Sequence, residues 1–151
     1  MKEHFAATPY MSSNLKEYNR IYKEVNEIYH EIAAKFGLSN SAFEILYTIC
    51  EVGDGCLQRD VCDASFLPKQ TVNSSIRKLE QSGCVTLSDG KGRSRHIHLT
   101  ESGHTLLKET IFPIIEAEND AFTELSQEEC ELLLKLHGKY IAALKEKFSR
   151  L

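Results

Sequence analysis

The fold of this chain is decided by residues 67–80, which read LPKQTVNSSIRKLE. Val72, Ile76 and Leu79 recur at steps of four and three, so the stretch predicts a helix with one buried side. The opposite side carries amides, hydroxyls and cations, namely Lys69, Gln70, Asn73, Ser74 and Arg77. Such groups read base edges and phosphates in a major groove, and Thr71 adds a hydroxyl that can bond a backbone carbonyl or a phosphate. Taken alone, this pattern fits an ordinary solvated helix face equally well.

Charge is distributed unevenly along the chain. The 151 residues carry a formal net charge of −4. Positions 65–99 hold six Lys and Arg residues against two acids, which gives +4 there and leaves −8 for the remainder. A basic patch on an acidic body predicts a polyanionic partner, and the acidic remainder disfavours binding in other orientations.

A second basic feature follows this helix directly. Residues 84–88 and 95–99 read as two strands, and the Gly-rich residues 89–94 read as the tip between them. Alternation places Ile97 and Leu99 on one face, whereas His96 and His98 are interpreted as outward residues near phosphates. The tip region is cationic, with Lys91, Arg93 and Arg95. Cationic tips on thin hairpins fit narrow minor grooves, so the combination favours DNA binding over a solvated basic turn.

Two further helices are predicted before residue 67. The first is capped by Ser39 or Ser41, and Ser41 with Glu44 fits a capping box. Its predicted buried side consists of Phe43, Leu46, Tyr47 and Cys50. The second spans residues 58–64, with Val61 and Cys62 inward. Short helix, turn, polar helix and hairpin give the order of a winged helix-turn-helix over residues 37–100.

Long amphipathic helices flank this module. Residues 14–36 carry a wide apolar stripe with three tyrosines, and Gly37 suits the helix end. A helix from Thr100 to about residue 125 is expected to kink at Pro113, and a last helix follows a Ser126–Glu129 capping box and runs to about residue 148. The predicted fold class is therefore mainly α with a small β-hairpin. Residues 1–36, an arm and a helix, and residues 101–151 are assigned to homodimerisation.

The order of elements resembles the MarR (multiple antibiotic resistance regulator) family of bacterial transcription factors over roughly residues 12–148. The resemblance is carried by LPKQTVNSSIRKLEQSG at 67–83 and GRSRHIHLTESG at 92–103. The family's recognition helix ends in leucine-glutamate and then a glycine, which are Leu79, Glu80 and Gly83 here. The wing arginine corresponds to Arg93, and the leucine-threonine-x-x-glycine that enters the next helix corresponds to residues 99–103.

This resemblance implies a triangular homodimer that binds double-stranded DNA at a pseudo-palindrome, as a repressor released by a small molecule or an oxidant. Carried over by position, the major-groove residues are Lys69, Gln70, Thr71, Asn73, Ser74 and Arg77, and Arg93 reaches the minor groove. The family often has an aspartate two residues before the wing arginine, where this chain has Lys91 and holds Asp89 two residues further back. Either Asp89 takes that role through a looser loop, or the wing is more mobile until DNA orders it.

The resemblance also implies a cleft for a small aromatic effector between the dimerisation helices and the winged module. The candidate lining residues are Tyr18, Tyr22, Tyr47 and Phe66. Taken singly, each of these is better explained as a core or dimer-interface aromatic.

The remaining chemistry of the sequence is sparse. The five cysteines (50, 56, 62, 84 and 130) are an odd number and predict free thiols in a reducing compartment, with Cys56 the most exposed. The six histidines show no metal-ligand spacing, so neither metal nor cofactor is predicted. Neither a membrane-spanning apolar stretch nor a signal peptide is recognised, and a cytoplasmic protein is expected.

Three interpretations follow. The first is a ligand-responsive, dimeric DNA-binding regulator, and the second is a cysteine-based redox-sensing regulator on the same scaffold. The third is a winged-helix protein-interaction module without DNA binding. An enzyme is not predicted, because the sequence presents no nucleophile–base pair, phosphate loop or metal motif.

Overall fold

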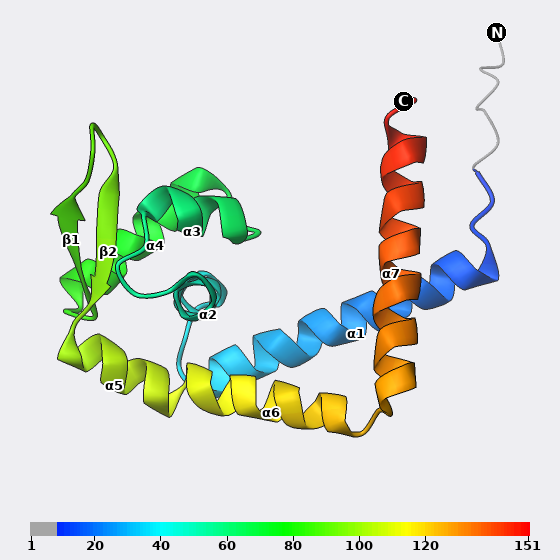
Figure 1. The fold of residues 1–151 in the computed structure, drawn as a ribbon, viewed down its shortest axis with the longest axis horizontal. Coiled ribbons are helices and arrows are strands. Elements are labelled where there is room, and N and C mark those ends of the chain that lie inside the picture. Colours follow the sequence, from blue (N-terminus) through cyan, green and yellow to red (C-terminus); the bar gives the residue numbers. More distant parts are fainter. Residues whose placement is uncertain (1–8) are drawn as a thin grey trace, which may run out of the picture. The chain divides into compact units, whose positions relative to one another are not determined.

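The computed structural model describes residues 9–151 (Figure 1), so the first eight residues of the predicted arm lie outside the described residues. The chain forms two units, and it passes from one to the other between Thr100 and Glu101. The first unit holds α1 (Ser13–Lys35), α2 (Asn40–Val52), α3 (Gln58–Ala64), α4 (Lys69–Gln81), β1 (Val85–Asp89) and β2 (Arg95–Leu99). The second holds α5 (Glu101–Glu109), α6 (Ile111–Thr123) and α7 (Gln127–Phe148). The predicted fold class, mainly helical with one small hairpin, is confirmed.

Local signals set both ends of α1. The Ser12 hydroxyl oxygen accepts a bond of 3.1 Å from the backbone N–H of Leu15. At the other end Gly37 has a φ of 70°, and the N–H of Leu38 donates to the carbonyl of Ala33 at 2.9 Å. This is a Schellman motif, which needs a residue that tolerates the left-handed region. Only Ala33 of α1 is buried, so the apolar stripe of this helix stays largely exposed.

The core of the first unit lies among α2, α3, α4 and the hairpin. Its largest fully buried side chains are Ile45, Leu46, Ile49, Val61, Val72, Ile76, Val85 and Ile97. The predicted inner side of α4 is confirmed, because Val72, Ile76 and Leu79 are all buried. Ser75 is buried beside them, and its hydroxyl donates to Ser41 Oγ on α2 at 2.9 Å. This bond satisfies a polar group that would otherwise cost free energy in the core.

The predicted buried side of α2 was only half right. Phe43 and Leu46 are buried, but Tyr47 and Cys50 are half-buried. The deeper positions are Ile45 and Ile49, which the predicted stripe omitted. The difference comes from tertiary packing, because α2 contacts α1, α3 and α4. These three helices cover more of the α2 surface than a single apolar stripe.

The start of α2 also differs from one of the two predicted caps. Ser39 is the N-cap, and its hydroxyl oxygen accepts from the N–H of Ala42 at 3.2 Å. The predicted Ser41–Glu44 capping box is wrong: Ser41 lies inside the helix and binds Ser75, and Glu44 accepts a bond from the N–H of Phe66.

The hairpin pairs β1 with β2 in antiparallel register, with Leu87 opposite Ile97 and Asp89 opposite Arg95. A third segment, residues 54–57 between α2 and α3, joins the outer edge of β2. Gly55 N–H donates to the carbonyl of Ile97 at 2.9 Å, and Ile97 N–H donates to the carbonyl of Cys56 at 2.9 Å. The Leu99 N–H donates to Asp54 Oδ1 at 2.8 Å. The base of the hairpin is thus bonded to the loop that opens the helix-turn-helix.

The predicted long helix after Thr100 is two helices. α5 ends at Glu109, and α6 begins at Ile111, with Thr110 between them at φ −123° and ψ −64°. Pro113 stands in the first turn of α6. Its ring clashes with the carbonyl four residues earlier, which belongs to Glu109, and the proline lacks the N–H that would continue the ladder. The interruption therefore lies before the proline rather than at it.

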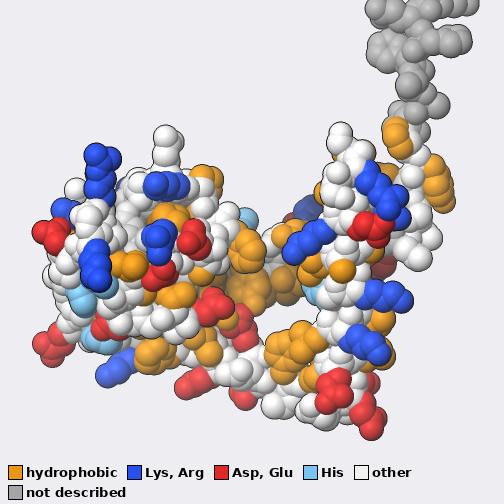
Figure 2. All heavy atoms as spheres, turned by 45° about the horizontal axis from the view of Figure 1, so that its top comes forward, with side chains coloured by type: hydrophobic (Ala, Val, Ile, Leu, Met, Phe, Trp, Pro, Cys, Tyr) orange, Lys and Arg blue, Asp and Glu red, His pale blue; other side chains and the backbone are white. Residues whose placement is uncertain are grey.

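The last helix, α7, begins at the predicted capping box. The N–H of Glu129 donates to Ser126 Oγ at 3.2 Å, and the N–H of Ser126 donates to Glu129 Oε2 at 2.8 Å. No residue of α7 is buried. Large apolar side chains stay exposed along it: Leu132, Leu133, Leu134, Leu136, Tyr140, Ile141 and Phe148. Figure 2 shows apolar side chains at the surface around this helix.

Candidate nucleic-acid interface

Helix α4 presents the predicted polar residues on the side opposite its buried face. The chain enters the helix through Pro68, and it leaves through Gly83, whose φ of 77° permits a Schellman end. Lys69, Gln70, Ser74 and Arg77 are exposed, and Thr71 and Asn73 are half-buried. The Ser74 hydroxyl donates to the Thr71 carbonyl at 3.0 Å, so the Ser74 oxygen is left to accept a bond from a ligand.

The wing tip, residues 90–94, is a tight turn. The Gly90 N–H donates to the Ser94 carbonyl at 2.8 Å, and the Ser94 hydroxyl donates to the Lys91 carbonyl at 2.6 Å. A Cβ on Gly90 would lie 2.7 Å from Ser94 Oγ and 3.1 Å from the Ser94 carbonyl oxygen, so a side chain at this position would displace Ser94. These bonds leave the side chains of Lys91 and Arg93 exposed at the tip.

Asp89 does not hold the wing arginine. Its carboxylate lies 4.0 Å from Arg95 Nε, its cross-strand neighbour, and both side chains are exposed. Among the described residues, Arg93 has no carboxylate within ion-pair distance. The exposed Asp89–Arg95 pair contributes little to stability, but it places a negative charge beside Arg95. The Arg93 guanidinium has no such neighbour in the described part of the chain and keeps its full charge available for an external anion.

The two wing histidines have different environments. His96 is half-buried, and its Nδ1 donates to the Gly55 carbonyl at 2.8 Å. The prediction that His96 faces outward was therefore only half right, because the segment at residues 54–57, along the edge of β2, partly covers the His96 ring. His98 is exposed as predicted, and its Nε2 lies 2.9 Å from Ser88 Oγ.

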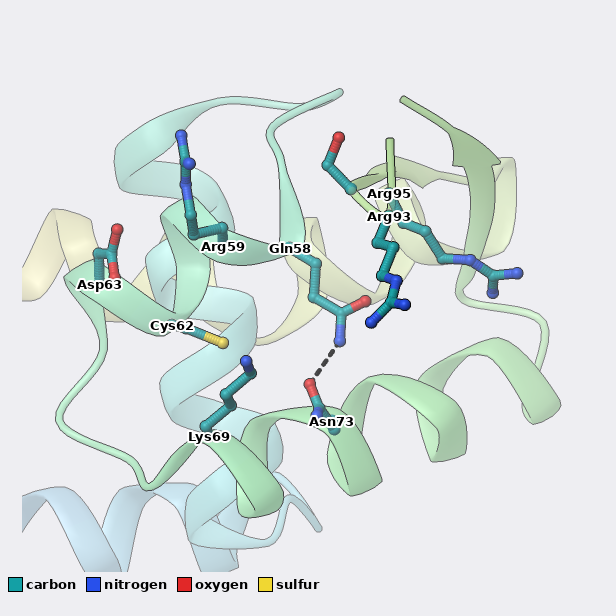
Figure 3. A pocket seen from close by; sticks show the side chains of 9 residues that line it. Gln58, Arg59, Cys62, Asp63, Lys69, Asn73, Arg93 and Arg95 are labelled. Atoms are coloured by element: carbon teal, nitrogen blue, oxygen red, sulfur yellow. Dashed lines mark hydrogen bonds between the residues drawn. The ribbon is translucent and has the colours of Figure 1, made fainter. Parts of the chain in front are cut away.

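A groove of about 450 Å³, open to solvent, lies between α3, α4 and the wing. We call it the basic groove, and its lining is Gln58, Arg59, Cys62, Asp63, Lys69, Asn73, Arg93, Ser94 and Arg95 (Figure 3). Four cations face a single carboxylate there, so the groove attracts anions. Figure 2 shows further Lys and Arg side chains on the surface of the same unit.

The groove brings together some of the predicted site residues and not others. Lys69, Asn73, Arg93 and Arg95 line it, whereas five others lie elsewhere on α4 or the wing: Gln70, Thr71, Ser74, Arg77 and Lys91. Sequence reasoning missed Gln58 and Arg59, both in the first turn of α3. The Gln58 amide donates to Asn73 Oδ1 at 2.6 Å. The local signal that could have indicated these two residues is their position, because they are polar residues at the start of the first helix of the helix-turn-helix.

The four predicted effector residues come from three different segments of the first unit. Tyr18 and Tyr22 lie on α1, Tyr47 lies on α2, and Phe66 lies in the turn before α4 with 95% of its surface exposed. The ring centroids of Tyr47 and Phe43 lie 5.9 Å apart with the ring planes tilted by 45°, and those of Phe43 and Tyr29 lie 6.1 Å apart. None of the four lines the basic groove. Their role as effector contacts stays a prediction.

The cysteines are all free, and only Cys84 is buried. Burial raises the pKa of the Cys50, Cys56 and Cys62 thiols, and the Asp60 carboxylate raises that of Cys56 further. A raised pKa lowers the fraction of reactive thiolate at neutral pH, so these environments do not favour a redox switch. Within residues 9–151, no cluster of three or more His, Cys, Asp or Glu side chains has metal-binding geometry. In the same range, no helix combines the length and apolarity needed to cross a bilayer.

Comparisons with known proteins agree on one family. The family model that matches, over residues 36–94, is that of the MarR family. The structure resembles NMB1585, a MarR family regulator from Neisseria meningitidis, with a TM-score of 0.78, 19% identity and coverage of 92% of this chain and 99% of that one. It also resembles MepR of S. aureus in a DNA complex, with a TM-score of 0.67, 25% identity and coverage of 90% and 99%. A third similar structure is BpsR of Bordetella bronchiseptica, with a TM-score of 0.62, 19% identity and coverage of 82% and 98%. No curated protein matches this chain in sequence.

Proposed function

We propose that this chain is a transcriptional regulator of the MarR family, which its similarity to that family supports, and that it binds a pseudo-palindromic operator in double-stranded DNA as a homodimer. The observation that carries the proposal is the basic groove between α3, α4 and the wing tip. It joins a polar helix face to a cationic hairpin within one unit, which is the arrangement that a major groove and its adjacent minor groove require. The DNA complex of the similar MepR structure supports the same use of the fold.

Each group of side chains has a different task in this proposal. Gln70 and Asn73 contact base edges, because amides carry the hydrogen-bonding groups that pair with those edges. Lys69, Thr71, Ser74 and Arg77 complete the major-groove face. Lys91, Arg93 and Arg95 lie at the wing, where the negative potential of a narrow minor groove attracts cations. Arg59 adds a phosphate contact on the other wall of the basic groove.

The dimer is supported by apolar surface that the single chain does not cover. On α1, Ile21, Tyr22, Val25 and Ile28 are all exposed, and α7 buries no residue at all. Water contact with two such helices is unfavourable, and a second copy of the chain covers both at once. We therefore assign residues 1–36 and 101–151 to dimerisation and residues 37–100 to DNA.

Regulation by a small molecule completes the proposal. The BpsR structure is described as showing regulation of that protein's DNA binding by 6-hydroxynicotinic acid. We infer that this chain is a cytoplasmic repressor that releases its operator when a small aromatic compound binds, with Tyr18, Tyr22, Tyr47 and Phe66 as the candidate contacts.

The test is binding to a labelled duplex from upstream of the chain's own gene, with a scrambled duplex of the same length as control. Affinity is measured by fluorescence anisotropy at several salt concentrations between 50 and 200 mM, and the mass of the free protein by light scattering. We expect a dimer that protects two half-sites about one helical turn apart, with an affinity that falls steeply as salt rises. Equal affinity for both duplexes, or a monomer, would contradict the proposal.

A further inference from the structure

We propose that Gln58 sets the base specificity of the recognition helix by fixing the amide of Asn73 so that it faces DNA with its N–H donors. The inference rests on the proposed DNA-binding function and assigns a role to a residue outside the predicted recognition helix. In this arrangement Gln58 is a positioning residue, and Asn73 makes the base contact.

The geometry that carries this inference is one hydrogen bond between two helices. Gln58 opens α3 and Asn73 lies in the second turn of α4, fifteen residues later. Gln58 Nε2 donates to Asn73 Oδ1 at 2.6 Å, and both side chains are half-buried. Figure 3 shows this bond crossing the basic groove from one helix to the other, beside the wing residues Arg93 and Arg95.

The bond constrains what Asn73 can offer. A free asparagine reads adenine with both ends of its amide, because Oδ1 accepts from N6 and Nδ2 donates to N7. Here Gln58 occupies one of the two lone pairs of Oδ1 and fixes the oxygen in the direction of α3, which disfavours the bidentate adenine contact. The Nδ2 group keeps its two N–H donors.

Donors of this kind select acceptor edges. In the major groove guanine presents two acceptors, N7 and O6, and thymine presents O4, whereas cytosine presents an N4 donor. We therefore expect guanine or thymine at the base contacted by Asn73, with cytosine the most disfavoured. The half-burial of the pair strengthens the constraint, because water competes poorly for a bond inside the groove.

Two substitutions invert the pattern by different routes. Gln58→Glu replaces the donor with a carboxylate, which accepts from Asn73 Nδ2 and turns the Asn73 oxygen outward. Asn73→Asp keeps an acceptor for Gln58 but gives the DNA a carboxylate oxygen in place of the N–H donors. Both changes predict a shift of preference toward cytosine or adenine at one position in each half-site. Gln58→Ala releases the Asn73 amide for the bidentate adenine contact and therefore predicts a shift of preference toward adenine at that same position.

The experiment selects bound duplexes from a library randomised over both half-sites and compares the wild-type protein with the three variants. Arg59→Gln is the matched control, because it lowers the net charge by one unit, as Gln58→Glu does, but leaves the amide pair intact. It should weaken binding to all sequences without changing the preferred base. We expect discrimination at the affected position to change on the order of 5- to 150-fold, which is the range of a good base contact. Thermal unfolding of each variant shows whether the fold is retained.

The outcomes separate the two levels of the inference. If the wild-type protein selects a sequence but the variants at positions 58 and 73 keep the same base at every position, Gln58 only joins α3 to α4, and the inference is overturned. If Asn73→Asp shifts the preferred base but Gln58→Glu and Gln58→Ala do not, Asn73 reads the base without help from Gln58, which also overturns it. If the wild-type protein selects no sequence and does not bind DNA, the proposed function fails, and this inference fails with it.

Discussion

The sharpest prediction concerns the salt dependence of DNA binding after Arg93→Ala. Arg93 is exposed at the wing tip, and no carboxylate of the described chain lies within ion-pair distance of it. Its full charge is therefore available to displace a counterion from DNA. Each neutralised phosphate contributes about 0.9 to the slope of log affinity against log salt, so two wings in a dimer contribute about 1.8.

This slope converts into a measurable ratio. Between 50 and 200 mM salt, a slope difference of about 1.8 means that the wild-type protein loses roughly 12-fold more affinity than Arg93→Ala. The Arg95→Ala variant should change the slope less, because Arg95 already lies 4.0 Å from Asp89. Lys108→Ala, on the exposed surface of α5 and outside the basic groove, is the control and should leave the slope unchanged.

Anisotropy titrations of one duplex at four or five salt concentrations give each slope directly. If Arg93→Ala has the wild-type slope, the wing tip does not contact DNA, and the assignment of Arg93 is wrong. If Arg95→Ala flattens the slope more than Arg93→Ala does, the argument from the Asp89 pair is wrong instead.

Three further changes test other parts of the structure. Ile49→Ala should lower the free energy of unfolding by about 2–5 kcal/mol in urea titrations, because it empties a fully buried site. The neighbouring Cys50→Ala should cost clearly less, and equal costs would mean that the buried side of α2 is misassigned. Gly90→Ala should weaken DNA binding while leaving the protein folded by circular dichroism, because its Cβ would lie 2.7 Å from Ser94 Oγ; unchanged affinity would show that the tip geometry is irrelevant to binding. Burial, and to a smaller extent the Asp60 charge, raises the pKa of Cys56. The rate of its reaction with a disulfide reagent should therefore rise with pH through a midpoint above that of a cysteine in an unstructured peptide. A midpoint below the peptide's would contradict this.

Features with local causes were predictable from the sequence. The buried side of α4 follows from the spacing of Val72, Ile76 and Leu79, and all three are buried. The capping box at Ser126 follows from two side chains three residues apart. The strand at residues 95–99 and the glycine-containing tip before it were also predictable, because their conformation depends on residues close by in the sequence.

Features with distant causes were not predictable in this way. The cover of His96 comes from the Gly55 carbonyl, 41 residues earlier, and alternation along a strand carries no information about it. The pairing of Gln58 with Asn73 requires α3 and α4 to be packed before it exists. The break at Thr110 depends on the clash between the Pro113 ring and the carbonyl four residues earlier. The sequence pattern indicated only that the helix would be distorted near this proline.

The segment at residues 54–57 has a consequence for how this scaffold tolerates change. Its bonds to Ile97, Leu99 and His96 fasten β2 to the body of the unit, and the tip at residues 90–94 lies beyond these attachments. Those five residues form a tip that can be replaced while β2 and its attachments stay the same. Tips of different charge or length can be grafted there to retune minor-groove contacts, without disturbing the helix that reads the bases.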